Sequence, residues 1–383
     1  MKFYGYEDDE LKGHLGGGRF SVSYRIAGTE AEALEKAKNL CVEQTAEFPA
    51  QHIECDAIRR EILGRVETLS ACAGGYRALI SYADEIATDE FPQFLNVVFG
   101  NSSLLPGITV ERVFLSPRLA EWYGGPRFGV PGLRERVRAF GRPLSFTALK
   151  PMGLPSRALA EEAYRCALGG IDLIKDDHGL VNQPFSTYRE RVRMCCEAVR
   201  RANRETGGAA AYIPNVSGGF DTIADRIRFA EDCGAGGVML APGLVGFGAL
   251  HEAARRSGLP VVCHPSFSGG WIDRGNGGFD CGCIVGQIPR IAGADVVVFP
   301  NCGGRFSISE EQCRRIGAMC GEELCGMKPV FPAPSGGMRP EKTEEMVKFY
   351  GKDVALLMGG GLFTASPDLV ENCRRFRERL ENA

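Results

Sequence analysis

Eight short apolar runs, separated by stretches with helical periodicity, fill the chain from residue 146 onward. Each run is four or five residues long and lacks apolar–polar alternation, which is typical of parallel strands buried on both faces. The runs are 146–150, 171–175, 209–213, 237–240, 260–264, 295–299, 329–333 and 354–358. The intervening stretches predict helices at 156–168, 190–205, 222–232, 308–320, 341–350 and 366–380.

Eight strand–helix units in about 240 residues match the size of a (β/α)₈ barrel. A doubly wound open sheet is the alternative arrangement for the same units, and the count of eight favours the barrel. We therefore predict a TIM barrel over residues 126–383 that carries the active site.

Residues 1–125 mix strand and helix patterns and predict a separate domain. Strands are expected at 19–27, 61–69, 76–83 and 108–114, with helices at 30–42 and 93–99. This β-α-β-β-α-β order predicts a ferredoxin-like α+β sandwich. Residues 117–141, rich in Gly, Pro and Arg, are interpreted as the connection to the barrel.

Composition narrows the classes of partner. Charged residues make up 24% of the chain and the net charge is -3, so no basic surplus points to nucleic acid or to an anionic membrane. No apolar run approaches the roughly 18 residues that span a bilayer, and the N-terminus has no apolar signal core. We expect a cytoplasmic protein whose partner is a small molecule.

The chain has 15 cysteines, and only Cys281 and Cys283, with Cys302 later, suggest a metal cluster. Because no second close pair accompanies them, buried thiols are a better interpretation than a zinc site.

Catalytic groups of a barrel come from the C-terminal ends of its strands. Lys150, then Lys175-Asp176-Asp177-His178, then Asn215 and His264 stand at or just past these ends. Two of the five histidines fall among them, so we expect the active site at this rim.

Two glycine-rich segments follow the last two runs: Ser335-Gly336-Gly337 and Gly359-Gly360-Gly361. Glycines let backbone N–H groups approach an anion without interference from Cβ atoms. Since barrels often bind phosphate with the loops after strands seven and eight, these segments predict a phosphate site.

Several motifs resemble those of the RuBisCO large-subunit superfamily. They are TALKPMGL at 147–154, GGIDLIKDDHG at 169–179, PSGGM at 334–338, MGGGL at 358–362, VEQT at 42–45 and FGNSS at 99–103. The resemblance covers nearly the whole chain, and the motifs occur in the same order as in the family. The positions at which this sequence departs from the family pattern, described below, are similar to those of RuBisCO-like proteins, the form IV group without CO₂ fixation.

The resemblance implies roles for individual residues. Lys175 matches the lysine that CO₂ carbamylates to form a ligand of Mg²⁺, and Asp177 matches a carboxylate ligand of the same ion. Lys150 matches a lysine that transfers protons near the enediolate, and His264 matches an active-site histidine. The two glycine segments match substrate and phosphate contacts, with Ser335, Gly337, Gly360 and Gly361 at the matched positions.

Glu43 and Asn101 match N-domain residues that reach the active site of a partner subunit. The resemblance therefore implies a homodimer with its active sites at the subunit interface.

Departures from the family pattern change the expected chemistry. His178 stands where a third ligand, Glu, is usual, so it either binds the metal weakly or acts as a base. Met152 replaces a lysine, and the loop that should present a lysine to CO₂ reads Gly303-Gly304-Arg305-Phe306. Pro265 replaces an arginine that would hold a second phosphate, which implies a substrate with one phosphate and no CO₂ fixation.

We therefore expect a Mg²⁺-dependent enzyme that enolises a sugar phosphate, in which Lys150 or Lys175 moves the proton. An isomerase of the 5-methylthioribulose 1-phosphate type and a decarboxylase of a 3-oxo sugar-acid phosphate both fit, the latter with Arg305 binding the carboxylate. The KDDH segment disfavours a methionine-salvage enolase. A non-catalytic regulatory protein is the alternative from another class.

Overall fold

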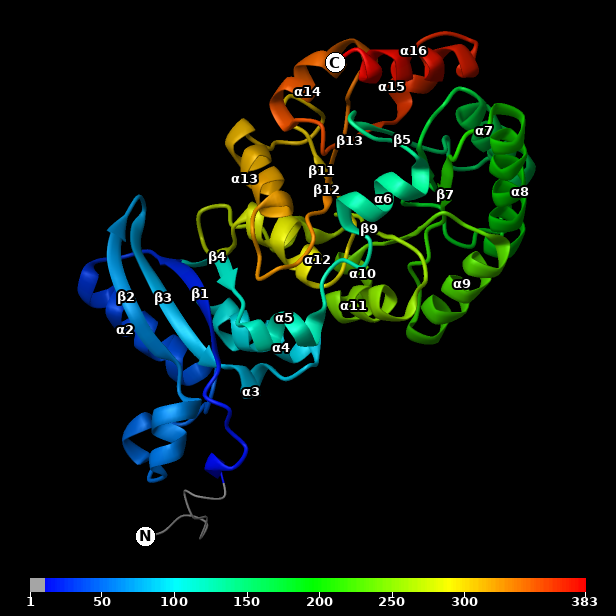
Figure 1. Cartoon of the computed structure of the whole chain (residues 1–383). Helices are drawn as coiled ribbons and strands as arrows, with labels where there is room; N and C mark the ends of the chain where they lie inside the picture. The colour runs from blue at the N-terminus through cyan, green and yellow to red at the C-terminus, as the bar shows by residue number, and fades with distance from the viewer. Residues whose placement is uncertain (1–10) are drawn as a thin grey trace. The chain divides into compact units, whose positions relative to one another are not determined.

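The computed structural model of the chain describes residues 11–383, which divide into two compact units (Figure 1). The first unit holds residues up to 124 together with 270–287 and 323–327, and the second holds 125–269, 288–322 and 328–383. Residues 1–10, and the interpretation of the N-terminus that depends on them, lie outside the described residues. We keep 1–125 and 126–383 as the proposed domains.

The first unit is built on a five-stranded sheet in the order β10-β4-β1-β3-β2. Strand β1 pairs antiparallel with both β3 and β4, and β2 pairs antiparallel with β3, as in a ferredoxin-like sandwich. The strands are β1 (Arg19–Ile26), β2 (Arg65–Cys72), β3 (Gly75–Ala83), β4 (Ile108–Phe114) and β10 (Gly278–Phe279). The short β10, parallel to β4, was not expected from the sequence.

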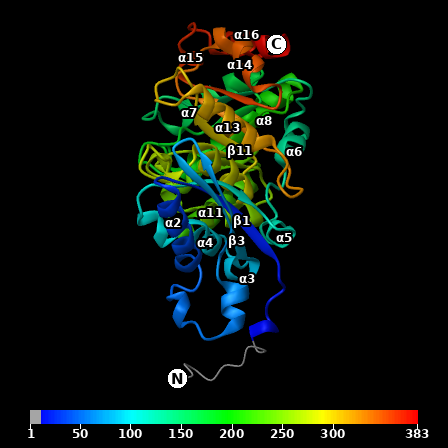
Figure 2. The ribbon, with the colours of Figure 1, turned by 90° about the vertical axis from the view of Figure 1, so that its left-hand side faces the viewer.

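The helices of this unit are α2 (Glu30–Glu43), α3 (Asp84–Ala87), α4 (Phe91–Phe99) and α5 (Pro117–Tyr123). Helix α2 lies against the sheet (Figure 2). Helix α4 packs on β1, where the rings of Phe94 and Phe20 lie 5.6 Å apart and the Tyr24 hydroxyl donates to the Val98 carbonyl. These contacts bury the apolar face that the alternation of β1 predicts.

Two expectations for residues before the barrel were wrong. The strand expected at 61–69 begins only at Arg65, because Ile58–Ile62 forms a π-helix. The expected connection at 117–141 contains α5 and also α6 (Gly129–Val137). The Ser116 side chain caps α5 by accepting from the Leu119 N–H, so the Pro that follows marks a helix start rather than a loop.

All eight predicted runs form strands of a parallel α/β barrel, which confirms the predicted fold class. The strands are β5 (Leu144–Ala148), β6 (Leu173–Lys175), β7 (Ala211–Ile213), β8 (Val238–Leu240), β9 (Val261–Cys263), β11 (Val296–Pro300), β12 (Phe331–Ser335) and β13 (Ala355–Met358). They pair in parallel as β13-β5-β6-β7 and as β12-β11-β9-β8. A bridge between Asn215 and Met239 joins the end of β7 to β8. Strand β12 lies next to β13, so the two groups of four strands meet on both sides.

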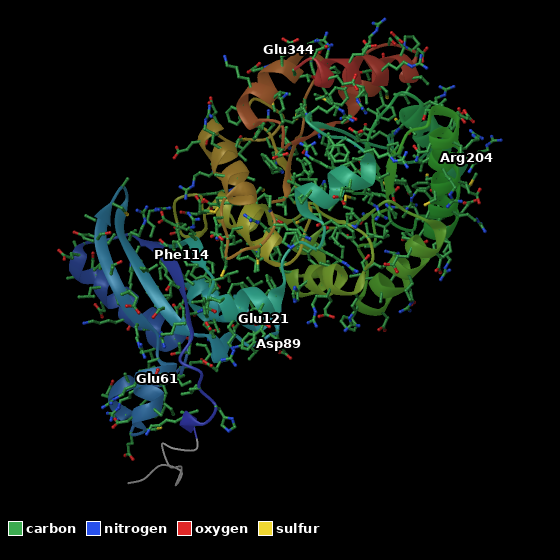
Figure 3. All side chains as sticks on the ribbon, viewed as in Figure 1. Glu61, Asp89, Phe114, Glu121, Arg204 and Glu344 are labelled. Atoms are coloured by element: carbon green, nitrogen blue, oxygen red, sulfur yellow. The ribbon has the colours of Figure 1, made fainter. Side chains whose placement is uncertain are left out.

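Helices surround these strands (Figure 1). They are α7 (Ser156–Leu168), α8 (Tyr188–Thr206), α9 (Phe220–Cys233), α10 (Pro242–Val245), α11 (Phe247–Arg256), α12 (Ile288–Ile291), α13 (Glu310–Gly321), α14 (Thr343–Tyr350), α15 (Gly360–Phe363) and α16 (Leu369–Glu381). Arg204 on α8 and Glu344 on α14 lie on the outer side (Figure 3). Among residues 11–383, no helix has the length and apolar character needed to cross a bilayer.

A buried polar network lies at the N-terminal end of the barrel, where β5 and β6 begin. The Asp172 carboxylate accepts two hydrogen bonds from Arg142 at 2.7 and 2.8 Å and one from Arg377 at 2.9 Å. The Ser145 N–H also donates to it, at 2.8 Å. This network joins the first strand to the second and to the last helix, α16.

Asp172→Ala is expected to destabilise the protein by about 3–5 kcal/mol, because two arginines lose their buried partner. The matched control is Asp353→Ala, since the Asp353 side chain is 66% exposed and its pair with Arg134 should contribute at most about 1 kcal/mol. Urea unfolding followed by far-ultraviolet circular dichroism measures both. Equal losses for the two variants would contradict the role given to Asp172.

Candidate active site

The barrel brings the predicted catalytic side chains to one rim. Lys175 is the last residue of β6, and Asp177 and His178 come two and three residues later. Lys150 comes two residues after β5, and His264 follows β9. Because parallel strands end at the same edge, these five residues gather at the C-terminal end of the barrel, as expected.

Asp177 is the centre of their contacts. Lys150 Nζ donates a hydrogen bond to Asp177 Oδ2, and the Gly179 N–H donates to Oδ1 at 3.1 Å. His178 Nδ1 lies 3.3 Å from the same Oδ1. The His178 ring stacks on the His264 ring, with centroids 4.7 Å apart and planes 10° from parallel.

Burial sets the protonation of these groups. Lys175 is 2% exposed, and its desolvation lowers the pKa to about 8 although Asp177 opposes the shift. Burial also lowers the pKa of His178, and burial together with Lys175 holds the pKa of His264 well below its usual value. Both imidazoles are therefore neutral at neutral pH, and each can accept or donate one hydrogen bond.

Asp177 stays ionised. Burial would raise its pKa, but the hydrogen bonds from Lys150 and from the Gly179 backbone outweigh it, and the pKa is lowered. Asp177 is thus an ionised carboxylate that accepts a hydrogen bond from Lys150.

A buried ion pair that the sequence interpretation missed supports this rim. Asp176 and Arg191 are both fully buried, and both Asp176 oxygens lie 3.2 Å from Arg191 Nε. The Tyr212 hydroxyl donates to Asp176 at 2.6 Å and the Asn215 N–H donates at 3.0 Å. Arg191 follows Tyr188 at i+3 on the apolar face of its helix, and this spacing is the signal that could have predicted its burial.

Asn215 adds a second support. Its Nδ2 donates to the His178 carbonyl at 2.9 Å, so the segment that carries Asp177 and His178 is tied to the end of β7. The sequence placed Asn215 at the rim without giving it a role.

The two glycine segments lie beside this cluster. A Cβ at Gly359 would lie 3.5 Å from Lys150 Cε, and a Cβ at Gly361 would lie 2.8 Å from the Met338 carbonyl oxygen. Gly336 and Gly337 have φ of +88° and +99°, which side chains rarely adopt. Glycine is thus required where the loops after β12 and β13 approach each other.

The other predicted binding residues are placed as follows. The Arg305 N–H donates to the Gly336 carbonyl at 3.0 Å, so the loop after β11 rests on the loop after β12. Ser335 Oγ donates to the Phe299 carbonyl at 3.0 Å, which joins two strands. A Cβ at Gly360 would meet nothing within 4 Å, so open space lies beside it.

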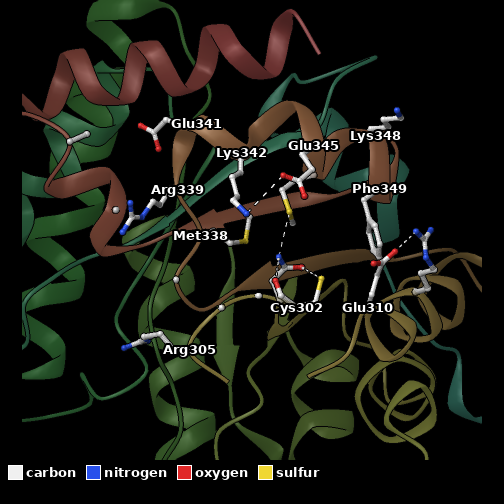
Figure 4. A pocket seen from close by; sticks show the side chains of 18 of the residues that line it. Cys302, Arg305, Glu310, Met338, Arg339, Glu341, Lys342, Glu345, Lys348 and Phe349 are labelled. Carbon is white, nitrogen blue, oxygen red and sulfur yellow. Dashed lines mark hydrogen bonds and ion pairs between the residues drawn. The ribbon is translucent and has the colours of Figure 1, made fainter. Parts of the chain in front are cut away.

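A cavity of about 1,230 Å³ opens from these loops (Figure 4). Arg305, Gly337 and Gly361 line it, whereas the catalytic cluster around Asp177 does not. Arg305 and Arg339 lie at one end and Phe349 at the other. The cavity therefore extends from the predicted phosphate loops rather than from the cluster around Asp177, and Arg339 is a cation there that the sequence interpretation missed.

Glu43 and Asn101 lie in the first unit and contact each other. Asn101 Nδ2 donates to Glu43 Oε1 at 3.1 Å and to Glu47 Oε1 at 3.3 Å. Leu104, which is 85% exposed, lies three residues after Asn101.

Cys281 and Cys283 are buried. In the part of the chain that the structure describes, no three His, Cys, Asp or Glu side chains gather as a metal site.

Comparisons with known proteins identify the family. The family model of the ribulose bisphosphate carboxylase large chain, catalytic domain, matches residues 129–368. Ribulose bisphosphate carboxylase-like protein 1 of Rhodopseudomonas palustris is 38% identical over 94% of this chain and 96% of its own length. The 5-methylthioribulose-1-phosphate isomerase of Rhodospirillum rubrum is 35% identical over 94% of this chain and 95% of its own length.

A solved structure agrees with these relatives. The crystal structure of a Rubisco-like protein from Rhodopseudomonas palustris has a TM-score of 0.85 and 36% identity, and the match covers 95% of this chain and 98% of that one. The chain therefore belongs to the RuBisCO superfamily, as an enzyme of its RuBisCO-like, form IV branch.

Proposed function

We propose that the protein isomerises a ketose phosphate of the 5-methylthioribulose 1-phosphate type through an enediolate. The observation that carries this proposal is the hydrogen bond from Lys150 to Asp177, beside two neutral imidazoles and next to glycine loops. The similarity to the Rhodospirillum rubrum isomerase, 35% over nearly the whole chain, supports the substrate class.

The reaction moves a proton and releases nothing. A base takes a proton from the carbon next to the carbonyl, the enediolate forms, and a proton returns to a different carbon. We assign this transfer to Lys150 Nζ, which Asp177 holds at the rim. The Lys150 ammonium first releases a proton to solvent, and the neutral amine then takes the proton from carbon and returns it. His264 Nδ1 lies 2.9 Å from Ser266 Oγ, which orients the ring and leaves Nε2 for a substrate oxygen.

The residues present can hold Mg²⁺ if Lys175 is carbamylated. Asp177 supplies a carboxylate and His178 a neutral imidazole, but a third ligand requires the carbamate of Lys175. Burial lowers the pKa of Lys175 to about 8, which raises the fraction of neutral amine that can attack CO₂ and release a proton to form the carbamate. Bound Mg²⁺ would supply a Lewis acid that stabilises the enediolate charge.

One phosphate is expected at the glycine loops. Gly337 and Gly361 line the cavity together with Arg305, whose guanidinium can donate two parallel hydrogen bonds to an anion. Arg305 stands where CO₂ fixation would need a lysine, so we propose no carboxylase activity.

A decarboxylase of a 3-oxo sugar-acid phosphate is the second candidate. The position of Arg305 at the cavity favours it, because a guanidinium there could bind the substrate carboxylate.

We also propose a homodimer. Glu43 and Asn101 contact each other beside the exposed apolar side chains of Phe48, Leu104 and Leu105. Exposed apolar side chains close in sequence to polar groups that the family resemblance assigns to a partner's site support burial against a second copy.

The first experiment follows proton exchange in D₂O by NMR, with Mg²⁺ and bicarbonate or with EDTA. The substrates are 5-methylthioribulose 1-phosphate, ribulose 1,5-bisphosphate and a branched 3-oxo acid phosphate. We expect conversion of the first, reduced by EDTA and lowered about 10²–10⁴-fold by Lys150→Met. Lys38→Met, on the surface of α2, is the matched control.

Two results would contradict the proposal. Release of CO₂ from the 3-oxo acid phosphate, without conversion of the methylthio substrate, would favour the decarboxylase. Unchanged exchange in Lys150→Met would remove Lys150 from the mechanism. His178→Ala tests the remaining metal ligand, and intact Mg²⁺ affinity with intact turnover would exclude both roles given to His178.

Glu162 on α7 holds the backbone of the catalytic lysine. Its Oε2 accepts a hydrogen bond from the Lys150 N–H at 3.3 Å. Burial raises the pKa of Glu162 from 4.5 to about 7, and the hydrogen bond from Lys150 only partly opposes this. The folded protein therefore binds this proton more tightly than the unfolded chain, and the stability falls as the pH rises from about 4.5 to about 7.

Glu162→Gln should remove this loss while its amide oxygen still accepts from Lys150. We expect little change in thermal stability at pH 5 and a gain on the order of 1–2 kcal/mol at pH 8, allowing for partial exposure. Thermal unfolding at both pH values measures the difference, with Glu161→Gln on the exposed side of α7 as control. A variant less stable than wild type at pH 8 would show that the charged form of Glu162 is required.

A further inference from the structure

Phe267 adopts a backbone conformation that its side chain disfavours. It lies in a turn that the Ser268 N–H closes by donating to the Pro265 carbonyl at 3.1 Å, and its φ is +68°. The third position of a turn with positive φ is normally Gly or Asn, because a Cβ clashes with the backbone there. A phenylalanine at this position is strained.

Burial within the chain does not compensate for this strain. The Phe267 residue is 79% exposed, so its ring adds little to the core of the barrel. Strain of this kind persists where the surrounding structure holds it, and it is concentrated at functional sites. An exposed aromatic ring in a strained turn therefore points to an external binding partner.

The turn is fixed directly to the active site. Ser266, next to Phe267, has its Oγ 2.9 Å from His264 Nδ1, and its N–H donates to the same nitrogen at 3.3 Å. On the other side, a Cβ at Gly243 would lie 2.9 Å from the Phe267 carbonyl carbon, so helix α10, which follows β8, supports the turn. Phe267 thus has a defined place one residue beyond the Ser266–His264 contact.

The chemistry of this segment fits an apolar group. Residues 265–269 read PSFSG and contain no charged side chain. Pro265 occupies the position where the family resemblance places an arginine for a second phosphate, so the loop after β9 offers an aromatic ring where a cation would bind an anion. The phosphate loops follow β12 and β13, farther around the barrel.

We propose that Phe267 binds the apolar end of the substrate, remote from its phosphate, and selects substrates with an alkylthio or alkyl substituent over those with a hydroxyl group. This inference rests on the isomerase proposed above. It assigns to Phe267 a role in specificity, through contact with the apolar terminus rather than with the reacting carbons.

The test uses Phe267→Gly in the full-length protein. Glycine suits the positive φ, so the variant should fold with equal or greater thermal stability while it loses the ring. The kcat/KM values are compared for 5-methylthioribulose 1-phosphate and ribulose 1-phosphate. We expect the preference for the methylthio substrate to fall about 10- to 100-fold, mainly through a higher KM for that substrate.

Phe140→Ala is the matched control, because Phe140 is 65% exposed but precedes β5 at the opposite end of the barrel. Phe267→Leu should restore part of the preference, since it returns apolar surface without the aromatic ring. The oligomeric state of each variant is measured by light scattering.

The outcomes separate the two proposals. If the wild type converts the methylthio substrate and Phe267→Gly keeps the wild-type preference within twofold, the role of Phe267 is refuted and the isomerase stands. The same preference with a change from dimer to monomer would assign the ring to a subunit contact, which also overturns the inference. A wild type that converts neither substrate refutes both.

Discussion

The Asp176–Arg191 ion pair determines how the catalytic rim is built. Two charges that are removed completely from water are tolerated only when their hydrogen bonds are satisfied, and here Tyr212 and the Asn215 N–H complete the shell of Asp176. Arg191 in turn donates to the Val181 and Ser186 carbonyls at 2.8 Å. The pair thus fixes both ends of the segment 176–186, so the neighbouring Asp177 leaves the strand at a defined place.

The two neighbouring aspartates of the segment 175–178 have different roles, one structural and one in the proposed chemistry. Asp176 is committed to Arg191, whereas Asp177 is paired with Lys150 and remains available at the rim. At the other end of the barrel, Asp172 pairs with Arg142 and holds the start of β6 in place. The three-residue strand β6 therefore lies between the buried Asp172 and the segment that carries Asp177.

The sequence predicted the barrel strands well because strands buried on both faces must be continuously apolar. It predicted helix α6 poorly, since the pattern of Val130, Leu133 and Val137 was obscured by neighbouring Gly and Pro residues. The site residues could be placed because they follow strands, but the burial of Arg191 depends on its contacts with Asp176. The strain at Phe267 could not be predicted, since φ depends on how helix α10 supports the turn.

The charge balance of the rim connects these features to the proposed chemistry. Lys150 donates to Asp177, while burial keeps His178 and His264 neutral and lowers the pKa of Lys175. Enolisation creates negative charge on the substrate oxygens, and the Lys150 ammonium together with oriented neutral imidazoles stabilises that charge more than it stabilises the ketone. A second anion at the loop after β9 would weaken this preference, which is consistent with an uncharged turn at Pro265 and Phe267 and with a substrate that carries its only phosphate at the glycine loops.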